Sequence, residues 1–429
     1  MIKLPKEVNF IVNTLEKAGM TAYCTGDCVR QSLSGIEPLD WDLAVSGGLA
    51  AVSELFPDAE KLYGEDDVLR FDYTPGGKLA GRNAELAGAG SDEDEEALII
   101  DLHVVENVEE YLKKAAFTIN AIGDSTSRGQ LDPLGGKSDL SKRLIRTGKD
   151  AAEVFSRKPE LMLRAISLAA EMDFDLAKAT YDGILANVGK LSSVSRGIIR
   201  EEFCNMMGCS GAGKALKLLA SCNMMGAILG PDVKGLTHRE LSDISEVAEK
   251  ITKTKNIYER RLGLFYICLN KKKARAAIEY MNYEEELRGH LLDAVNEIEN
   301  VFFLTNSLKM KDYLSRVGWD RYEYIHNVSK AQLAVFEGPS TRVEGRIFML
   351  EQFKMRREPI FIEDLKITGE KLQEAGLCKT EEETHKLLIA LTDTVHRDPS
   401  QNTEVRLLER AKWLKKHKFL ALFRNVEWK

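Results

Sequence analysis

The sequence has little that is typical of a secreted or membrane protein. No apolar run approaches the roughly 20 residues needed to span a bilayer, and the N-terminal residues MIKLP lack the apolar core of a signal peptide. The seven cysteines include no Cys-x-x-Cys pair, so we expect reduced, mostly buried thiols rather than disulfides or a zinc site. We therefore expect a cytoplasmic protein without a membrane partner.

An excess of positive charge is also absent. The chain has 60 Lys and Arg against 67 Asp and Glu, a net charge of −7. This balance argues against nucleic-acid binding over the whole surface but permits a local basic face. The charge is uneven, because an acidic run at 91–96 contrasts with a basic segment at 410–418. With 429 residues, the chain is long enough for two or more domains with separate cores.

Helix and strand signals alternate in residues 1–145, which predicts an α+β head. Apolar residues at helical spacing predict a helix over 4–19, and short apolar runs predict strands at 21–24, 41–45 and 97–105.

Beyond the head, strand signals nearly vanish, and we expect helices throughout. We divide this part into a helical neck at 146–230 and a helical body and tail at 231–429. Within the head, a Gly-, Ala- and acid-rich stretch at about 74–97 has little to bury, which predicts a mobile insertion.

The most informative residues lie around a glycine turn and a pair of aspartates. Asp40 and Asp42 are two apart on a predicted strand, so their carboxylates point to one face, and paired carboxylates favour Mg²⁺. Upstream, Gly26 permits close approach of the backbone to a phosphate, and Arg30 in the following helix can pair with one. The alternative is that two surface aspartates flank a buried Trp41.

Other polar residues extend this candidate site. Asp101 lies in a strongly apolar strand, where an unpaired charge is costly, so it is a candidate third carboxylate. Alternatively, it caps the end of a strand. Thr118 and Asn120 suit either the fixing of a turn or the binding of a ribose.

A series of motifs accompanies these residues in a fixed order. They are Ala22-Tyr23, Gly26, Val29-Arg30, Asp40-Trp41-Asp42, Phe117-Thr118-Ile119-Asn120-Ala121, Asp132-Pro133, Gly136, Asp139-Leu140, Leu163-Arg164-Ala165 and Phe174. Together they resemble the tRNA nucleotidyltransferase and bacterial poly(A) polymerase family, in particular the class II CCA-adding enzymes. The resemblance covers residues 5–180 well, continues weakly through 190–230 and returns faintly at the tail.

The resemblance implies a polymerase-beta-like nucleotidyltransferase palm in the head, followed by an all-α neck, body and tail. It implies that Asp40 and Asp42 hold two Mg²⁺, with Asp101 as a further catalytic carboxylate. The implied substrate is the 3′ end of tRNA or another RNA, with CTP and ATP as donors and pyrophosphate as the product. The implied nucleotide-binding residues are Gly26, Arg30, Lys114, Asn120, Arg157, Lys158 and Arg164.

Departures from the family pattern predict altered nucleotide selection. The second glycine of the family's turn is Asp27 here, and the family's Arg-Arg-Asp is replaced at 114–116 by Lys-Ala-Ala. The family's Glu-Asp-x-x-Arg corresponds to residues 157–161, where Lys158 replaces the Asp and Leu161 replaces the Arg. Because Leu161 cannot hydrogen-bond, a base cannot be read there in the family's way.

Three interpretations stay open. The chain is a divergent but active nucleotidyltransferase, a catalytically weak or inactive paralogue that binds RNA, or a nucleotidyltransferase with an acceptor other than tRNA. Basic side chains of the helical half are candidates for RNA contacts, although runs of lysine are also typical of a solvated helix face. These candidates are Lys271, Lys272, Lys273, Arg356, Arg357, Lys412, Lys415 and Lys416.

Overall fold

The computed structural model describes residues 2–62, 67–73, 98–339 and 341–417. The insertion predicted at 74–97 lies outside the described residues. Within them, the α+β head followed by helices is confirmed.

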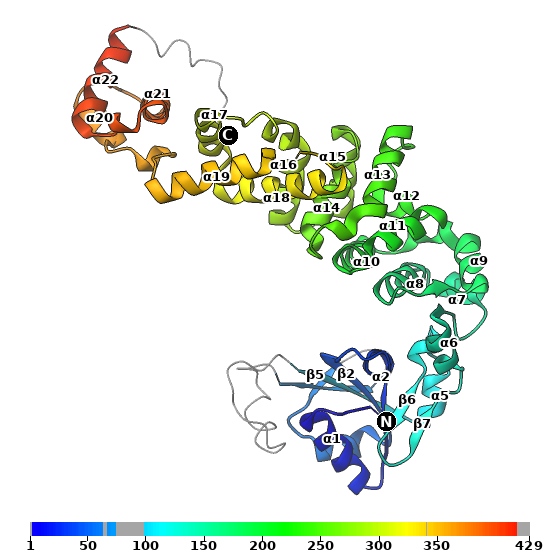
Figure 1. The fold of residues 1–429 in the computed structure, drawn as a ribbon. Coiled ribbons are helices and arrows are strands. Elements are labelled where there is room, and N and C mark those ends of the chain that lie inside the picture. The colour runs from blue at the N-terminus through cyan, green and yellow to red at the C-terminus, as the bar shows by residue number, and fades with distance from the viewer. Residues whose placement is uncertain (1, 63–66, 74–97, 340, 418–429) are drawn as a thin grey trace. The chain divides into compact units, whose positions relative to one another are not determined.

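The chain divides into two compact units (Figure 1). The first consists of Met1–Met206 with Lys217–Ala227, and the second of Met207–Leu216 with Ile228–Lys429. The finer boundaries expected at 145 and 230 remain predictions.

A seven-stranded sheet is the framework of the first unit, in the order β3-β4-β5-β2-β1-β6-β7. Strands β2 and β5 are parallel, and the other neighbours are antiparallel. The strands predicted from apolar runs correspond to β1, β2 and β5. The strands are β1 (Thr21–Thr25), β2 (Asp40–Ser46), β3 (Glu60–Leu62), β4 (Asp67–Asp72), β5 (Ile99–Val105), β6 (Gly123–Ser125) and β7 (Gly129–Leu131).

Helices α1 (Lys6–Lys17) and α2 (Gly26–Leu33) lie beside this sheet (Figure 1). The predicted helix α1 forms because apolar residues recur on one of its faces, and that face is buried. Its buried residues are Val8, Ile11, Val12 and Leu15. They share one core with Trp41, Leu43 and Val45 of β2 and with Ile100 and Leu102 of β5. This core fixes the two parallel strands that carry the candidate carboxylates.

Helices lie between strands of the sheet, and further helices with two two-residue strands follow it along the chain as far as residue 229. The predicted helix at 160–170 is α8, whose apolar residues are mostly buried. The elements are α3 (Leu49–Leu55), α5 (Val108–Leu112), η1 (Thr118–Asn120), α6 (Gly136–Lys142), β8 (Leu144–Ile145), α7 (Ala151–Arg157), α8 (Glu160–Glu171), β9 (Asp175–Leu176), α9 (Lys178–Asn187), η2 (Val188–Ser193), α10 (Arg196–Gly208), α11 (Ala212–Ser221) and α12 (Met225–Leu229).

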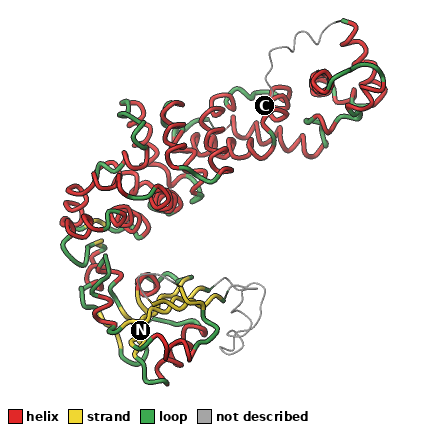
Figure 2. Tube along the Cα trace, turned by 180° about the vertical axis from the view of Figure 1, so that it is seen from behind, coloured by secondary structure: helices red, strands yellow, loops and turns green. Residues whose placement is uncertain are grey.

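Helices and loops make up the second unit, as Figure 2 shows. Two apolar clusters stabilise it, one centred on α16 to α18 and one on α20 to α22. None of the helices in the described part of the chain is long and apolar enough for a bilayer. The elements are α13 (His238–Lys250), η3 (Ile251–Lys253), α14 (Tyr258–Tyr266), α15 (Lys271–Met281), α16 (Glu285–Val301), α17 (Ser307–Val317), α18 (Trp319–Val335), α19 (Thr341–Arg356), η4 (Ile362–Asp364), α20 (Gly369–Glu374), α21 (Glu381–Arg397), η5 (Pro399–Gln401) and α22 (Glu404–Lys416).

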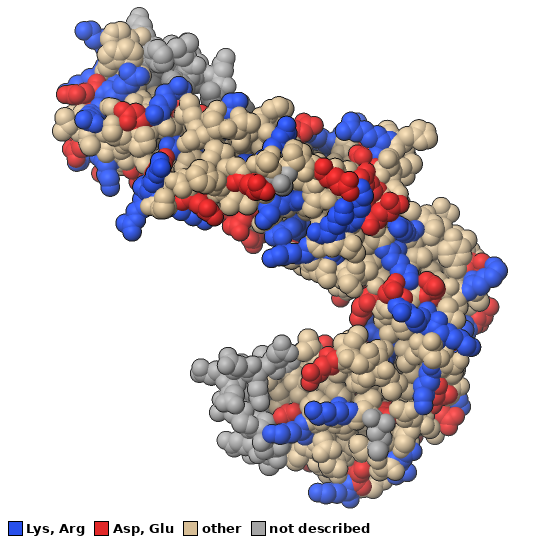
Figure 3. All heavy atoms as spheres, viewed as in Figure 1, with Lys and Arg blue, Asp and Glu red and all other residues tan. Residues whose placement is uncertain are grey.

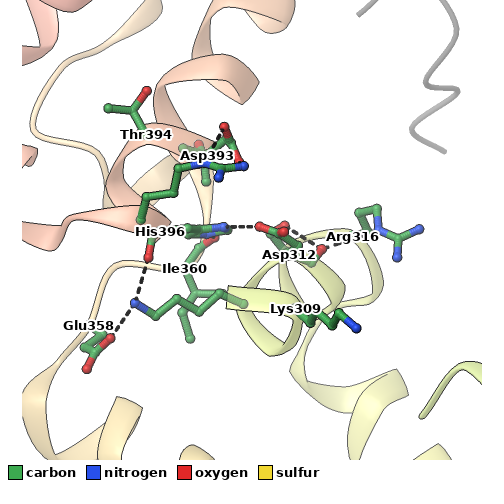
Figure 4. Close-up of polar contacts among 12 residues, drawn as sticks. Lys309, Asp312, Arg316, Glu358, Ile360, Asp393, Thr394 and His396 are labelled. Atoms are coloured by element: carbon green, nitrogen blue, oxygen red, sulfur yellow. Dashed lines mark hydrogen bonds and ion pairs between the residues drawn. The ribbon is translucent and has the colours of Figure 1, made fainter. Parts of the chain in front are cut away.

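A polar network joins α17 to α21 within this unit (Figure 4). The imidazole of His396 lies between the carboxylate of Asp312, 2.8 Å from Nδ1, and the carbonyl of Ile360, 2.8 Å from Nε2. Beside it, the buried ammonium of Lys311 pairs with Glu358 at 2.5 Å. Because His396, Lys311 and Glu358 are largely buried, these contacts satisfy polar and charged groups that would otherwise be costly in the interior.

Candidate functional site

Strand β2 places Asp40 and Asp42 on one face, because alternate residues of a strand point the same way. Between them, Trp41 points into the core and is 2 % exposed, which holds the strand in register. Asp40 is exposed and Asp42 is half-buried. The parallel pairing sets Asp42 directly opposite Asp101 of β5, so the three predicted carboxylates gather on one surface of the sheet.

The glycine turn lies against this surface. Gly26 has a φ of +71°, and a Cβ at this position would stand 3.0 Å from Oδ2 of Asp42. A side chain would therefore be strained and would crowd the carboxylate, so the turn requires glycine here. Nearby, burial raises the pKa of the Cys28 thiol to about 12, which makes this cysteine a packing residue rather than a nucleophile.

Arg70 of β4 is a site residue that the sequence reasoning missed. Its Nε donates to Asp101 Oδ1 at 2.8 Å and its Nη2 to Oδ2 at 2.7 Å. These hydrogen bonds with Asp101 raise the pKa of Arg70 and occupy both carboxylate oxygens in a bidentate pair. The alternation of Leu69 and Phe71, which are buried, with Arg70, which is not, was the available signal for an amphipathic strand.

His103 also faces the candidate metal residues. Its Nε2 is 3.6 Å from Oδ1 of Asp42, and its ring lies 5.5 Å from that of Tyr111. His103 and Asp101 are two apart on β5 and share a face, and this brings the histidine next to Asp42 of β2.

Arg30, Asn120 and Arg164 are brought together around Asp27. Arg30 Nη1 donates to Asp27 Oδ1 at 2.5 Å and to Asn120 Oδ1 at 2.5 Å. From α8, Arg164 Nη2 donates to Asp27 Oδ2 at 3.0 Å. Asp27, which departs from the family pattern, thus holds Arg30 and Arg164, and Asn120 is joined to them through Arg30.

The remaining residues of the nucleotide-binding prediction are at the surface. Lys114 and Lys158 are exposed, and Lys158 is the C-cap residue that follows α7. Arg157 pairs with Glu153 at 2.6 Å on the same helix. Leu161, partly buried in the first turn of α8, presents an aliphatic side chain. No hydrogen-bonding pair that could read a base is therefore formed by Lys158 and Leu161.

The basic residues proposed for RNA contacts fall into two groups. Some are engaged within the protein: Lys273 pairs with the buried Glu240 at 2.6 Å, Lys271 donates to the carbonyl of Asn296 at 3.0 Å, Arg356 lies 3.8 Å from Glu358, and Lys415 donates to the carbonyl of Leu377 at 2.5 Å. Others are exposed at the surface: Lys272, Arg357, Lys412 and Lys416. On the face that Figure 3 shows, Lys and Arg are interspersed with Asp and Glu.

The described residues contain one group of three or more His, Cys, Asp or Glu whose ligand atoms all lie within 4.8 Å of one another. It consists of Glu286, His290 and Asp320 in the second unit. Asp40, Asp42 and Asp101 do not form such a group, and both carboxylate oxygens of Asp101 are bound by Arg70. Asp40 and Asp42 remain a pair of hard oxygen donors on one face, which suits Mg²⁺.

The chain is similar in sequence to known proteins. Residues 22–146 match the family described as the poly A polymerase head domain. The chain is 30 % identical over 225 residues to the CCA-adding enzyme of Geobacillus stearothermophilus, covering 51 % of this chain and 54 % of the relative. It is 28 % identical over 235 residues to a CC-adding tRNA nucleotidyltransferase of Halalkalibacterium halodurans, covering 55 % and 57 %. The chain thus spans about half the length of the curated relatives it matches.

Solved structures extend the likeness at the level of the fold. A Bacillus stearothermophilus CCA-adding enzyme in complex with CTP has a TM-score of 0.75 at 18 % identity, over 97 % of this chain and 99 % of that one. A Thermotoga maritima CCA-adding enzyme complexed with tRNA has a TM-score of 0.62 at 16 % identity, over 96 % of each chain. The resemblance inferred from the motifs is confirmed, with this chain as a divergent relative.

Proposed function

We propose that the chain is a Mg²⁺-dependent nucleotidyltransferase that transfers a nucleoside monophosphate from CTP or ATP to the 3′-hydroxyl of tRNA, releasing pyrophosphate. The observation that carries this proposal is the contact between the glycine turn and the aspartate strand, where Gly26 lies against Oδ2 of Asp42. This contact supports the proposal because it brings a turn suited to a phosphate next to carboxylates suited to a metal ion. The similarity to CCA-adding enzymes supports tRNA as the acceptor.

The residues present fit a divalent metal ion. Asp40 is exposed, Asp42 is half-buried, and both offer hard carboxylate oxygens on one face of β2. When bound there, Mg²⁺ would lower the pKa of the attacking hydroxyl and stabilise the charge on the departing pyrophosphate. Two clustered carboxylates repel one another unless a cation lies between them, and this repulsion favours occupation of the site.

Around the metal residues, the turn would bind the phosphates of the donor. Gly26 begins α2, whose first N–H groups are available to an anion. Arg30 is 1 % exposed, and its Nη1 holds Asp27 and Asn120 beside the turn. Arg164 is more exposed and can reach a phosphate.

Nucleotide selection would differ from that of a protein that reads the base with an aspartate and an arginine. Lys158 is a donor and Leu161 offers no polar atom, so neither pyrimidine nor adenine finds a bidentate partner there. Discrimination between CTP and ATP would have to arise from the shape of the site. We therefore propose relaxed or altered selection.

For the RNA, we propose contacts through the exposed lysines and arginines of the second unit. Lys272, Arg357, Lys412 and Lys416 are exposed, whereas Lys273 and Lys415 are used for internal contacts. Trp413 is partly exposed, with the guanidinium of Arg410 4.4 Å from its ring centre, and offers an aromatic surface beside these lysines.

The test is extension of a tRNA that lacks its CCA end, with Mg²⁺ and one labelled nucleoside triphosphate at a time. We expect incorporation by the wild type and a loss of at least about 100-fold in Asp40→Ala and Asp42→Ala, because the metal ligands are removed. Glu54→Gln, an exposed acid of α3 outside the aspartate strand, controls for loss of an acid in the head. Extension that is equal in wild type and Asp40→Ala would contradict the proposal.

The second candidate is RNA binding without transfer. It is favoured by two observations: Arg70 neutralises Asp101, and Leu161 cannot read a base. In that case tRNA binds, but no triphosphate is incorporated. A nucleotidyltransferase with another acceptor would instead bind a Mg²⁺–nucleotide complex in an Asp40-dependent manner without extending tRNA.

A further inference from the structure

Asp27 joins two arginines that come from distant parts of the chain. It lies in the first turn of α2, directly after Gly26. Its Oδ1 accepts from Arg30 Nη1 at 2.5 Å, and its Oδ2 accepts from Arg164 Nη2 at 3.0 Å. One carboxylate therefore bridges two guanidinium groups, and the three side chains together carry one net positive charge.

Arg30 has further hydrogen-bonding capacity that Asp27 does not use. It is 1 % exposed, and in the described part of the chain its Nε and Nη2 have no hydrogen-bond partner. Glu171 is 4.0 Å from Nη2, beyond hydrogen-bond distance. Leaving two nitrogens of a buried guanidinium unsatisfied is costly. An anion with several acceptor oxygens would satisfy them better than one carboxylate can.

The contact between Asp27 and Arg164 is accessible to an anion in the solvent. The side chains of Asp27 and Arg164 are 37 % and 30 % exposed, so an anion can reach both ends of their contact. The pair lies beside Gly26, whose turn and helix N-terminus also favour negative charge. An incoming polyphosphate and the carboxylate of Asp27 therefore compete for the same positive groups.

We propose that Asp27 is an internal counter-ion that holds Arg30 and Arg164 in the free protein and opposes the binding of a polyphosphate at the glycine turn. The proposal rests on the proposed function in taking this turn as the phosphate site of the donor. The charge of Asp27 would then help to set the affinity for polyphosphate. Without that charge, the net charge of Asp27, Arg30 and Arg164 together rises from +1 to +2. Occupancy by a polyphosphate then requires Asp27 to be displaced.

Calorimetric titration of the full chain with sodium tripolyphosphate tests this, at low salt and without divalent metal or RNA. Asp27→Asn keeps the shape of the side chain and removes its charge, and we expect it to bind tripolyphosphate about tenfold more tightly than the wild type. The gain should shrink as salt is raised, because salt screens exposed charges. It should also disappear in Asp27→Asn/Arg164→Met. Glu109→Gln, an exposed acid of α5, is the matched control and should bind as the wild type does.

Two further measurements keep the test decisive. Tripolyphosphate should raise the unfolding temperature of Asp27→Asn more than that of the wild type, since a ligand stabilises the state that binds it. Arg164→Met in the wild-type background should weaken binding, and this variant leaves the contact between Asp27 and Arg30 in place. Equal or weaker binding by Asp27→Asn, binding by neither protein, or unchanged binding by Arg164→Met would each overturn the proposal.

These outcomes are separable from those of the proposed function. The titrations contain no nucleoside, metal or RNA, so a failure of tRNA extension leaves them unaffected. Conversely, extension that depends on Asp40 together with unchanged tripolyphosphate affinity in Asp27→Asn would overturn this inference alone.

Discussion

Arg70 holds both carboxylate oxygens of Asp101, with Nε 2.8 Å from Oδ1 and Nη2 2.7 Å from Oδ2. Asp101 stands directly opposite Asp42 in the parallel pair of β5 and β2. Two neighbouring carboxylates thus have different partners: Asp101 is neutralised by an arginine, and Asp42 faces the glycine turn and His103. This difference predicts unequal roles in metal binding.

We predict that Asp42→Asn reduces Mn²⁺ or Mg²⁺ affinity by at least about tenfold, whereas Asp101→Asn changes it less than about threefold. The reason is that a carboxylate already held by a bidentate arginine contributes little charge to a nearby cation. Calorimetry with Mn²⁺ measures both variants. A third variant, Arg70→Gln, removes the arginine that binds Asp101 and should therefore tighten metal binding. Equal losses in Asp42→Asn and Asp101→Asn would show that Asp101 is a ligand after all.

The sequence was sufficient to predict the strands that carry the carboxylates. Short apolar runs predicted β2 and β5, and the period of two placed Asp40 and Asp42 on one face. Arg70 could have been found in the same way, because Leu69 and Phe71 alternate with it. The parallel register that sets Asp42 opposite Asp101 could not, since pairing between strands depends on the packing of the whole sheet.

The long-range partners of charged residues could not be predicted from the sequence. Asp27 and Arg164 are 137 residues apart, and only the folded chain brings them together. Likewise, Lys273 was predicted to face RNA as part of a lysine run, and the structure shows it paired with Glu240. A run of lysines looks the same in sequence whether its members face solvent or a buried acid, so exposure decides between the two.

Nucleotide selection provides a second prediction. Each bidentate contact with a base is worth about 1–3 kcal/mol of discrimination, and Lys158 and Leu161 form none. We therefore expect the wild type to discriminate between CTP and ATP by less than about tenfold in single-nucleotide extension. Lys158→Asp/Leu161→Arg introduces an acceptor and a donor, respectively. This variant should raise the ratio between the extension rates with the preferred and the other triphosphate. Strict addition of C, C and A in order by the wild type would refute this expectation.

A third prediction concerns the basic side chains of α22. Lys412 and Lys416 are exposed, and each phosphate contact steepens the fall of affinity with salt. Lys412→Ala/Lys416→Ala should weaken tRNA binding and reduce the slope of log K against log salt by about 1 to 2. Binding at several salt concentrations measures this slope. Lys178→Ala/Lys142→Ala, two exposed lysines of the first unit, controls for the loss of net charge, and an equal change of slope in both pairs would argue against a specific role of α22.

Glu240 gives a prediction about acid stability. This largely buried carboxylate closes the capping box of α13, accepting from the N–H and hydroxyl of Thr237, and it also accepts from Asn270 and pairs with Lys273. Burial acts to raise its pKa, but Lys273 and the N–H groups of Thr237 and Asn270 outweigh it and lower the pKa of Glu240 from 4.5 to about 2. The carboxylate form is therefore the one that the fold stabilises.

Because this pKa is depressed in the folded state, the stabilisation is present above about pH 4.5 and is lost as the pH falls toward 2. At 1.36 kcal/mol for each unit of pKa, it amounts to roughly 3 kcal/mol. Glu240→Gln should lower the free energy of unfolding at pH 7 by about 2–3 kcal/mol and flatten its dependence on pH between 5 and 2. Denaturant unfolding at several pH values measures both, with Glu323→Gln, an exposed acid of α18, as the control. A variant that loses stability equally at pH 7 and pH 2 would mean that Glu240 contributes through packing and not through its charge.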